Sequence, residues 1–545
     1  MKKNHPSGSK STQNIAGKLR KLTSLITHAR DIETDTEALV NTLGEQHADP
    51  ANYPVDARLD INLQHLREML ADSFDFQIRE FSITASKRKA AVAFFAGMTD
   101  EEVIDTHVIG KLMLPPVAGL VFSSQQDEFA YLKNTLLTVA SFSEVDEMKP
   151  AVQQLLTGDA LLLIDDMPAF IVVKNKKMHH RAISEPEAES NVYAARDGFV
   201  EDLEINLTLI RRRLKNPNLI VKKITAGVRS STDFALLYFR GIADLRLVCE
   251  VERRLKQIKL DVPVGIGSVA GLIEDHPYSI FPTMLPTERP DKFAAALIEG
   301  KVGILMDGSP FSLLAPATLV DFFQTSDDYN EKWAIASLIR ITRYFSSLFA
   351  MATPAFFVAM TTFHPGLLPT PLAITIASAR LGIPFPAFLE ALVMEILLEV
   401  LQEAGIRLPK TIGPAVSIVG GLVIGEAAAR AGLVSSPMVI VIAFTAIASF
   451  NIANYRLNLI VRLLRVPLML LGTILGMFGV MIGLLALMAH LSIIDSFGVP
   501  YLAPVVPKNV RHFSDFKDTV VVAPPDRMDE RPAYLKPIDH KRQQK

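Results

Sequence analysis

The pattern of apolar and polar positions divides the chain into two unlike parts. Residues before about 335 mix apolar and polar positions as a soluble protein does, whereas residues from about 344 to 500 hold most of the long apolar runs. A run of about 20 apolar residues is long enough to cross the roughly 30 Å hydrocarbon core of a bilayer. The chain is therefore predicted to be an integral membrane protein with a large soluble N-terminal region.

The soluble region carries the mixed signals of an α/β protein. Val200, Leu207 and Leu214 belong to an apolar stripe that repeats every three or four residues, which predicts a helix over about 200–215. Short apolar runs such as ALLLIDD and AFIVVK, separated by a tight turn, predict strands. Because strands alternate with helices, a partly parallel sheet is expected. The predicted fold class is an α/β soluble N-terminal region of two α/β subdomains, followed by an all-α polytopic transmembrane domain.

These patterns predict five regions along the chain. They are a flexible basic and polar N-terminal tail, two cytosolic α/β subdomains, a membrane domain and a polar C-terminal tail, at residues 1–55, 56–176, 177–320, 321–505 and 506–545. The hydrophobic segments of the membrane domain lie near 344–363, 384–404, 411–430, 436–455 and 466–491. Five spans would place the C-terminus on the side opposite the soluble region, whereas the slightly basic tail favours the same side. The number of spans therefore stays open, and one segment could be re-entrant.

Several glycines of the membrane domain are candidates for close helix packing, because small residues let helices approach one another in lipid. These glycines are Gly420, Gly421, Gly425, Gly472, Gly476, Gly479 and Gly483. An amphipathic segment before the first span contains Trp333, Arg340 and Arg343, a composition that suits the membrane interface.

The segment FPAFLEALVMEILLEVLQEAG is apolar yet contains four glutamates. At 100° per residue Glu395, Glu399 and Glu403 share one helix face, and Glu390 lies off that stripe. One carboxylate at the bilayer centre costs roughly 2.5–3.5 kcal/mol on insertion scales, so this face would not tolerate lipid. Either the stripe lines water, as in a cation-favouring pore, or the helix lies in the interface plane or at a subunit contact. All four glutamates are candidate pore-lining residues.

No catalytic, metal or cofactor motif emerges from the sequence. VGIGSVAG lacks the spacing of a nucleotide loop, and His179 and His180 have no partners at metal-ligand spacing. Cys249, the single cysteine, is predicted to be a buried small apolar residue. A net charge of −2 gives no case for a nucleic-acid partner. The chain is thus expected to be no enzyme and to need no metal or cofactor.

Five long stretches resemble the spore germination receptor A-subunit (GerA) family of endospore-forming bacteria. They begin ISEPEAESNVYAARDGF, ERPDKFAAALIEG, FHPGLLPTPLAITIASA, VGGLVIGEAAARAG and SFGVPYLAP, and they occupy residues 183–219, 288–316, 363–413, 419–435 and 496–504. The similarity covers about 60–510 and leaves both tails outside it. Stretches of this length are far more specific than any short motif.

The resemblance implies a multi-pass protein of the inner spore membrane whose large N-terminal domain faces the spore core. It implies partners as well, namely a permease-like B-subunit and a lipoprotein C-subunit. It further implies that A-subunits form a homo-oligomer, a nutrient-gated cation channel whose pore would be sought at the acidic helix. Arg211, Arg212 and Arg213, near the end of the helix predicted over 200–215, are expected either to hold a subunit contact or to be solvated.

Three alternatives to the nutrient-gated channel stay open. A branch of the same family acts with the dipicolinate-release machinery. A secondary transporter would show inverted repeats, and none is visible in the sequence. A scaffold would use the membrane part only as an anchor.

Overall fold

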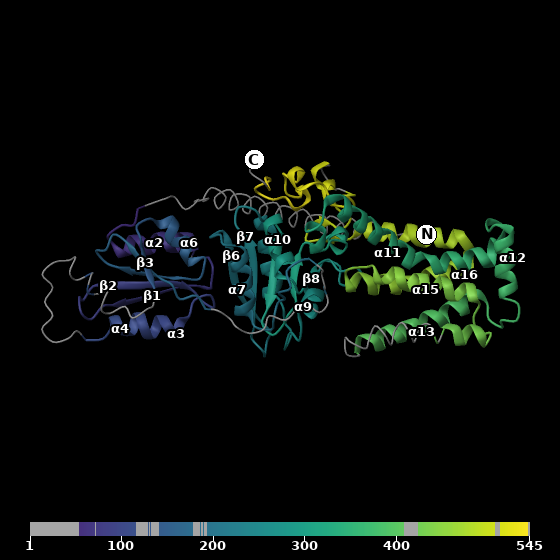
Figure 1. Ribbon diagram of the computed structural model, residues 1–545, viewed down its shortest axis with the longest axis horizontal. Coiled ribbons are helices and arrows are strands. Elements are labelled where there is room, and N and C mark those ends of the chain that lie inside the picture. Colours follow the sequence, from purple (N-terminus) through teal and green to yellow (C-terminus); the bar gives the residue numbers. More distant parts are fainter. Residues whose placement is uncertain are drawn as a thin grey trace, which may run out of the picture.

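The computed structural model describes residues 54–70, 72–115, 129, 131, 141–177, 186, 189, 193–407, 423, 425–506 and 513–542. Three parts follow one another along the long axis of the molecule (Figure 1): a first α/β subdomain, a second α/β subdomain and a bundle of helices. This arrangement confirms the predicted fold class of an α/β region followed by a helical region.

The first α/β subdomain is a five-stranded sheet covered by helices on both faces. Its elements are α2 (Leu59–Leu70), β1 (Phe76–Ser82), β2 (Lys89–Phe95), α3 (Glu101–Val103), the π-helix η1 (Ile104–Ile109), α4 (Gly110–Leu112), β3 (Phe142–Val145), α6 (Met148–Leu155), β4 (Ala160–Ile164) and β5 (Phe170–Val173). The strand order is β1-β2-β4-β5-β3. Apolar residues of α2 and α6 form a core on one face, and those of η1 and α4 form a core on the other.

The second α/β subdomain repeats this plan. Its elements are α7 (Leu203–Arg213), β6 (Leu219–Ala226), β7 (Thr232–Phe239), α8 (Leu245–Lys256), α9 (Ile266–Ile273), β8 (Leu285–Thr287), α10 (Pro290–Glu299), β9 (Val302–Met306) and β10 (Ser312–Ala315). The order β6-β7-β9-β10-β8 matches that of the first sheet position by position. The helix predicted over 200–215 is α7, which begins after Asp202, whose side chain accepts from the backbone N–H groups of Glu204 and Ile205.

The expectation of a partly parallel sheet is wrong, because every ladder between the described strands of both sheets is antiparallel. Helix α6 does connect two strands that run in the same direction, β3 and β4, but β5 lies between them. Helix α10 connects β8 and β9 across β10 in the same way. Alternation of strands and helices therefore arises here without any adjacent parallel pair.

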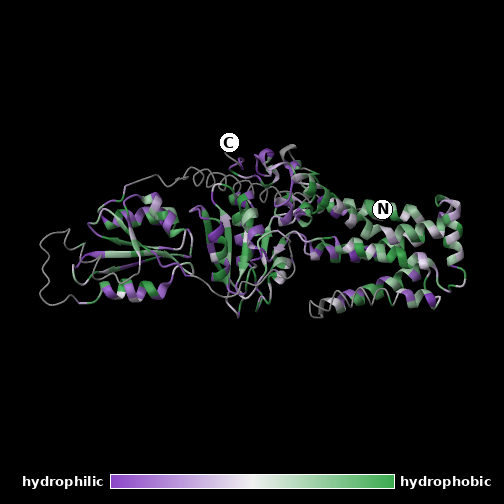
Figure 2. Cartoon of the chain, in the orientation of Figure 1, coloured by the Kyte–Doolittle hydropathy of each residue, from purple (hydrophilic) through white to green (hydrophobic). Residues whose placement is uncertain are grey.

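The helical bundle begins after two short 3₁₀ helices, η3 (Leu319–Phe322) and η4 (Ser326–Tyr329). Its elements are α11 (Trp333–Phe363), η5 (Pro365–Leu367), α12 (Thr370–Ala379), α13 (Ala387–Arg407), α15 (Ser436–Phe450) and α16 (Tyr455–Ile493). Within the described residues, α11 and α16 are long and apolar enough to cross a membrane. Figure 2 shows apolar residues concentrated along these helices. Most of the predicted segment 411–430, including Gly420 and Gly421, lies outside the described residues.

Helix α16 is a hairpin of two arms, whereas the sequence predicts one continuous helix over 466–491. The chain turns at Gly476, where φ is 64° and ψ is −145°. A Cβ atom on Gly483 would lie 2.6 Å from Leu468 Cδ2, although 15 residues of straight helix span about 22 Å. The turn packs against Phe363 at the end of α11. The candidate glycines Gly479 and Gly483 therefore serve packing between the two arms of the hairpin.

The first arm of α16 begins beside the second α/β subdomain, and the second arm ends beside it. Arg456, in the first turn, lies against Gly267 of α9. His490, near the end of the second arm, is 3.1 Å from the hydroxyl of Ser279 through its Nε2. The turn at Gly476 and the end of α11 define the opposite side of the bundle, called the far end below, and the side next to the subdomain is called the domain end.

The chain returns from the bundle to the second α/β subdomain. Elements β11 (Asp495–Ser496) and β12 (Val499–Pro500) are followed by three 3₁₀ helices, η6 (Phe513–Lys517), η7 (Pro525–Arg527) and η8 (Ala533–Leu535). Arg531 donates through Nε to the carbonyl of Ile298 at 2.8 Å, and the N–H of Ile538 donates to the carbonyl of Ile242. Residues 513–542, the C-terminal segment, are thus folded onto this subdomain, although their composition reads as a polar tail.

Candidate functional site

The acidic helix α13 lies antiparallel to the first arm of α16. Glu395 accepts from Arg465 Nη1 at 3.0 Å through Oε2, and Glu399 accepts from Arg462 Nε at 2.9 Å. The side chain of Arg465 is 1% exposed and that of Glu395 is 11% exposed, whereas Glu399 is more than half exposed. Two of the three carboxylates of the predicted stripe, Glu395 and Glu399, therefore have cationic partners within the same chain, among largely apolar helices.

The two ion pairs join residue 395 to residue 465 and residue 399 to residue 462, so the two helices run antiparallel here. Extended by one more turn of each helix, this register brings Gln402 to the level of Asn458, one amide to the level of another. We call this row of three facing positions the polar seam. Residues three or four apart lie on the same helix face, so the seam is one continuous stripe on each helix.

Several atoms of the polar seam are buried and have no hydrogen-bond partner within the described residues. They are Glu395 Oε1, Arg465 Nε, Arg465 Nη2, Gln402 Nε2 and Asn458 Oδ1. Buried polar groups in native proteins are normally hydrogen-bonded, to ordered water where no protein group is available. The seam therefore has unused donors and acceptors with which water or a small ion could interact.

Glu390 is separate from the polar seam, as the helix geometry predicts, and it is completely buried. One oxygen accepts from Arg380 Nε at 3.1 Å, and the other accepts from the N–H and the hydroxyl of Ser435 at 2.9 and 2.8 Å. Glu390 thus connects the start of α13 to α12 and α15 at the far end. Glu403 is exposed, on the turn of α13 beyond the seam.

The described candidate glycines lie at close helix contacts. A Cβ atom on Gly472 would lie 3.0 Å from the carbonyl oxygen of Ala355 in α11, and one on Gly425 would lie 3.3 Å from Val439 in α15. A Cβ atom on Gly479 would clash with the carbonyl oxygen of Leu471, on the opposite side of the turn. These contacts lie between helices of one chain.

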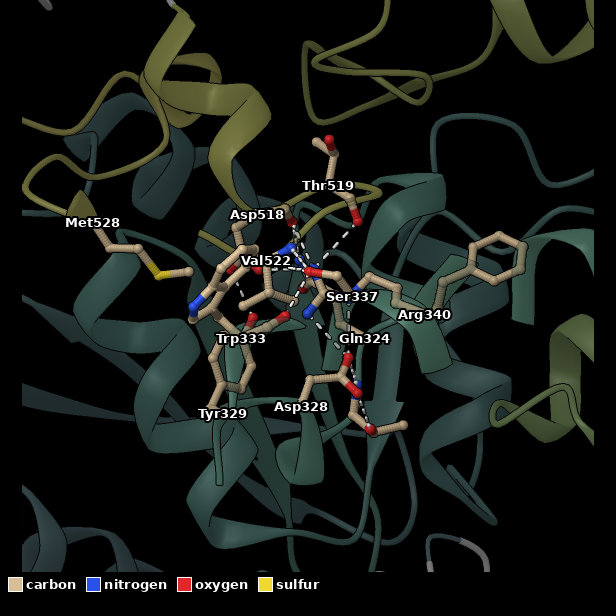
Figure 3. Close-up of polar contacts among 12 residues, drawn as sticks. Gln324, Asp328, Tyr329, Trp333, Ser337, Arg340, Asp518, Thr519, Val522 and Met528 are labelled. Carbon is tan, nitrogen blue, oxygen red and sulfur yellow. Dashed lines mark hydrogen bonds and ion pairs between the residues drawn. The ribbon is translucent and has the colours of Figure 1, made fainter. Parts of the chain in front are cut away.

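A second set of charges joins the bundle to the α/β region, and Figure 3 shows part of it, around Asp328, Arg340 and Asp518. Arg340, which is fully buried in α11, donates to Asp328 at 3.0 Å and to Asp518 of the C-terminal segment at 2.7 Å. Arg343 donates to Asp328 at 2.8 Å. Tyr329 donates its hydroxyl proton to Asp518 at 2.7 Å. We call this cluster the junction network. The sequence places Arg340 and Arg343 at the membrane interface but does not reveal their acidic partners.

The two α/β subdomains are connected through Arg211, whose side chain is 1% exposed. Its guanidinium forms a bidentate pair with Asp75, at 2.6 and 2.8 Å, and stacks over Phe95 at 4.4 Å. Arg213 pairs with Asp197 of its own subdomain, and Arg212 is exposed. Of the three arginines, Arg211 alone therefore holds a contact between subdomains.

Two other predictions from the sequence, for Cys249 and for the histidine pair, have different outcomes. Cys249 is exposed rather than buried, because α8 buries the stripe of Val248, Val251 and Leu255 and Cys249 lies beside it. His179 and His180 lie outside the described residues.

The chain thus belongs to a class of two-part proteins. One part consists of tandem α/β subdomains, and buried ion pairs join it to the other part, a bundle of apolar helices. A family model described as Bacillus/Clostridium GerA spore germination protein matches residues 64–534. The chain belongs to this family.

Individual relatives agree with the family match. Spore germination protein B1 of Bacillus subtilis is 37% identical over 90% of this chain and 99% of its own length. Spore germination protein GerLA of Bacillus cereus is 37% identical over 88% of this chain and 95% of its own length. An uncharacterized membrane protein, YfkQ of Bacillus subtilis, is 38% identical over 89% of this chain and 92% of its own length.

A solved structure matches about half of this chain. It is the crystal structure of the N-terminal domain of the A subunit of the Bacillus megaterium spore germinant receptor GerK3. It is 27% identical, covers 49% of this chain and 98% of its own, and has a TM-score of 0.38.

Proposed function

We propose that this chain is the A-type subunit of a spore germinant receptor, embedded in the spore membrane through its helical bundle. Family membership over residues 64–534 supports the role in germination. The apolar lengths of α11 and α16 support insertion in a membrane. The subunit would act with a permease-like B-subunit and a lipoprotein C-subunit, in a complex containing several copies of this chain.

Within that receptor, the chain conducts or gates cations, and the observation that carries this proposal is the polar seam. Two carboxylates, two guanidinium groups and two amides lie in a row in a largely apolar bundle, where each unpaired charge would cost several kcal/mol. Polar residues held at that cost within a membrane mark ion pathways and binding sites more often than they contribute to stability. The unused donors and acceptors of the seam are where water would enter.

The arginines define the closed state in this proposal. Arg462 and Arg465 occupy the carboxylates that a passing cation would need, so the seam as described is electrically neutral. Opening would separate α13 from the first arm of α16 and free Glu395 and Glu399. Because α11 contacts both helices and is held by the junction network, movement of the α/β region has a physical route to the seam.

Substitution of the seam carboxylates tests the channel proposal. Spores carrying Glu395→Gln or Glu399→Gln are compared with spores carrying Glu426→Gln, which removes an exposed ion pair with Arg430 elsewhere on the helices. Receptor level is measured by immunoblot and early cation release by flame photometry. We expect normal receptor levels in all three, with cation release changed several-fold only by the seam variants. Unchanged release in both seam variants would refute conduction through the seam.

The topology of the membrane part is tested through Cys249, the single and exposed cysteine. Because both arms of α16 end beside the second α/β subdomain, Cys249 and the C-terminal segment are expected on the same side of the membrane. A membrane-impermeant maleimide should label Cys249 and a cysteine placed at Lys536 in the same vesicle orientation. Labelling of the two positions from opposite sides would contradict the hairpin.

A further inference from the structure

A cavity of about 410 Å³ lies between the second α/β subdomain and the start of α16. Its walls are largely apolar and include Val264, Pro286 and Phe311. The first turn of α9 and residues Asn454 to Arg456 complete the lining. The cavity therefore lies at the domain end of the bundle, where the apolar arms of α16 begin.

Arg456 is the cation of this cavity, and it is half-buried. Within the described residues its guanidinium makes no hydrogen bond and no ion pair, in contrast to Arg462 and Arg465 on the same helix arm. Its Nη2 is 3.1 Å from the position that a Cβ atom on Gly267 would occupy. A partly desolvated guanidinium without an anionic partner is costly, so the surroundings are suited to receive an anion.

The two carboxylates near the cavity do not neutralise Arg456. Glu189 accepts from the hydroxyl of Thr287 at 2.5 Å and from Lys292 at 3.2 Å. Glu274 lies beyond ion-pair distance, and burial raises the pKa of its carboxyl to about 7 even though Arg456 acts to lower it. Near neutral pH Glu274 is therefore partly protonated and gives Arg456 little counter-charge.

The backbone of α9 adds to the positive potential at the cavity. The helix begins after Gly265, which provides no side-chain cap, so the N–H groups of its first turn face the same space as Arg456. Such a helix end contributes a partial positive charge of roughly half an elementary unit. Arg456 supplies the full charge, and α9 strengthens its field.

We propose that this cavity is a binding site for a phosphate-type anion joined to an apolar group, with the anion at Arg456 and the apolar group against Val264, Pro286 and Phe311. An anionic phospholipid has this chemistry and is available where the apolar arms begin. Exposed Tyr455 and Trp333 at the same end of the bundle are residues typical of the headgroup level. Free phosphate shares the anionic part alone.

Lipid retention by the purified full-length chain in neutral detergent tests the site. Native mass spectrometry would compare phosphatidylglycerol, phosphatidylcholine and inorganic phosphate as added probes. A charge-assisted contact is worth about 1.5–3 kcal/mol, so Arg456→Gln should weaken phosphatidylglycerol binding by about tenfold or more. Competition by inorganic phosphate would show that the anion alone is recognised. Equal retention of phosphatidylglycerol and phosphatidylcholine, or no effect of Arg456→Gln, would overturn the proposal.

Two glycines of α9 provide a matched pair of variants. Gly267→Leu places a side chain against the guanidinium of Arg456, whereas a Cβ atom on Gly271 meets nothing within 4 Å. We expect Gly267→Leu to reduce phosphatidylglycerol binding and Gly271→Leu to leave it unchanged. Equal losses in both would mean that the helix, rather than the cavity, had been disturbed, and would count against the site.

The pH dependence of binding gives an independent readout. Glu274 faces Arg456 of α16 and neighbouring Asp275, which is itself bound to Arg254. As pH falls below about 7 Glu274 becomes protonated, Arg456 is left uncompensated, and phosphatidylglycerol binding should tighten. Glu274→Gln should bind as tightly at pH 8 as the unaltered chain does at pH 6. An unaltered pH profile in that variant would contradict the electrostatic basis of the site.

Discussion

The two α/β subdomains share one topology but differ in what covers them. In the first, the residues of both faces form separate cores that end within the subdomain. In the second, the core on the α7 and α10 face continues without interruption into α11, α13, α15 and α16. Equivalent helices thus serve as an outer surface in one repeat and as an attachment surface in the other. The shared strand order makes the two subdomains alike. The residues on one face of the helices determine whether a subdomain attaches to the bundle.

The two subdomains also differ in the contacts that join each of them to the next part of the molecule. The first is held to the second by the buried pair of Arg211 and Asp75, by the more exposed pair of Arg240 and Asp72, and by short backbone contacts near β6. The second is held to the bundle by a shared apolar core and the junction network. Among the described residues, the apolar cores of the first subdomain are separate from the rest, whereas the second subdomain shares its core with α11.

The largest expected effect follows from breaking the junction network. Arg340→Met leaves Asp328 buried beside Arg343 alone and removes an anchor of the C-terminal segment. We expect the free energy of unfolding to fall by about 3–5 kcal/mol, since one partner of a buried pair is removed. Trp333, the single tryptophan, lies two turns away from Arg340 along α11, so its fluorescence reports melting of this joint. Lys332→Met, an exposed neighbour, should change stability by less than about 0.5 kcal/mol. Similar losses in the two variants would show that the joint does not depend on Arg340.

Breaking the joint of the first subdomain should cost about as much but remain local. Arg211→Met leaves Asp75 buried without its cation, a loss of about 3–5 kcal/mol. Hydrogen exchange should increase in α2, β1 and β2 while α11 and α16 stay protected. Arg212→Met, at an exposed position of the same helix, is the matched control. Loss of protection in the bundle would contradict the idea of a separable first subdomain.

Equivalent core positions sharpen the comparison further. Leu155 of α6 and Leu297 of α10 occupy matching helices and are both completely buried. Each change to alanine should cost about 2–5 kcal/mol through lost burial and the cavity left behind. Leu155→Ala should increase hydrogen exchange only within the first subdomain, whereas Leu297→Ala should also increase it in the bundle. If the two exchange patterns have the same extent, the second subdomain is not coupled to the bundle.

The smallest expected effect concerns the hairpin of α16. Gly476→Ala forces a side chain into a backbone conformation that favours glycine and against Phe363, at a cost of about 1–3 kcal/mol. Thermal melting followed by helical circular dichroism should show the loss. Gly366→Ala, where nothing lies within 4 Å and φ is ordinary, should melt like the unaltered chain. A Gly476 variant that melts like the unaltered chain would show that the glycine is not needed for the turn.

Local patterns predicted those parts of the fold that depend on neighbouring residues. The apolar stripe of α7 and the strands on both sides of the DMP turn are set by periodicity and turn chemistry, so the sequence was enough to find them. The antiparallel order of the sheets was missed because it depends on β5 and β10 inserting between strands that a helix connects. Periodicity along the chain carries no information about such insertions.

The sequence predicted one side of the polar seam, the carboxylates of α13, and missed the other side. Helix geometry correctly separated Glu390 from the stripe, because that depends only on angles within one helix. The partners Arg462 and Arg465 were missed because they come from an arm whose position depends on the turn at Gly476. The acidic residues of the junction network were missed for a similar reason, since Asp518 lies in a polar stretch whose docking requires Arg340. The Arg-x-x-Arg spacing of α16, which complements the Glu-x-x-x-Glu spacing of α13, is the signal that could have found the seam.

The position of Asp518 has a consequence for how the molecule is assembled during synthesis. A ribosome completes α11, α13, α15 and α16 before residues 513–542 emerge, so Arg340 has only Asp328 as an acidic partner until then. The joint between the α/β region and α11 closes only when residues 513–542 fold back onto it. A chain that stops short of this segment would present an open joint, and the cell's quality-control proteases would meet it in that state.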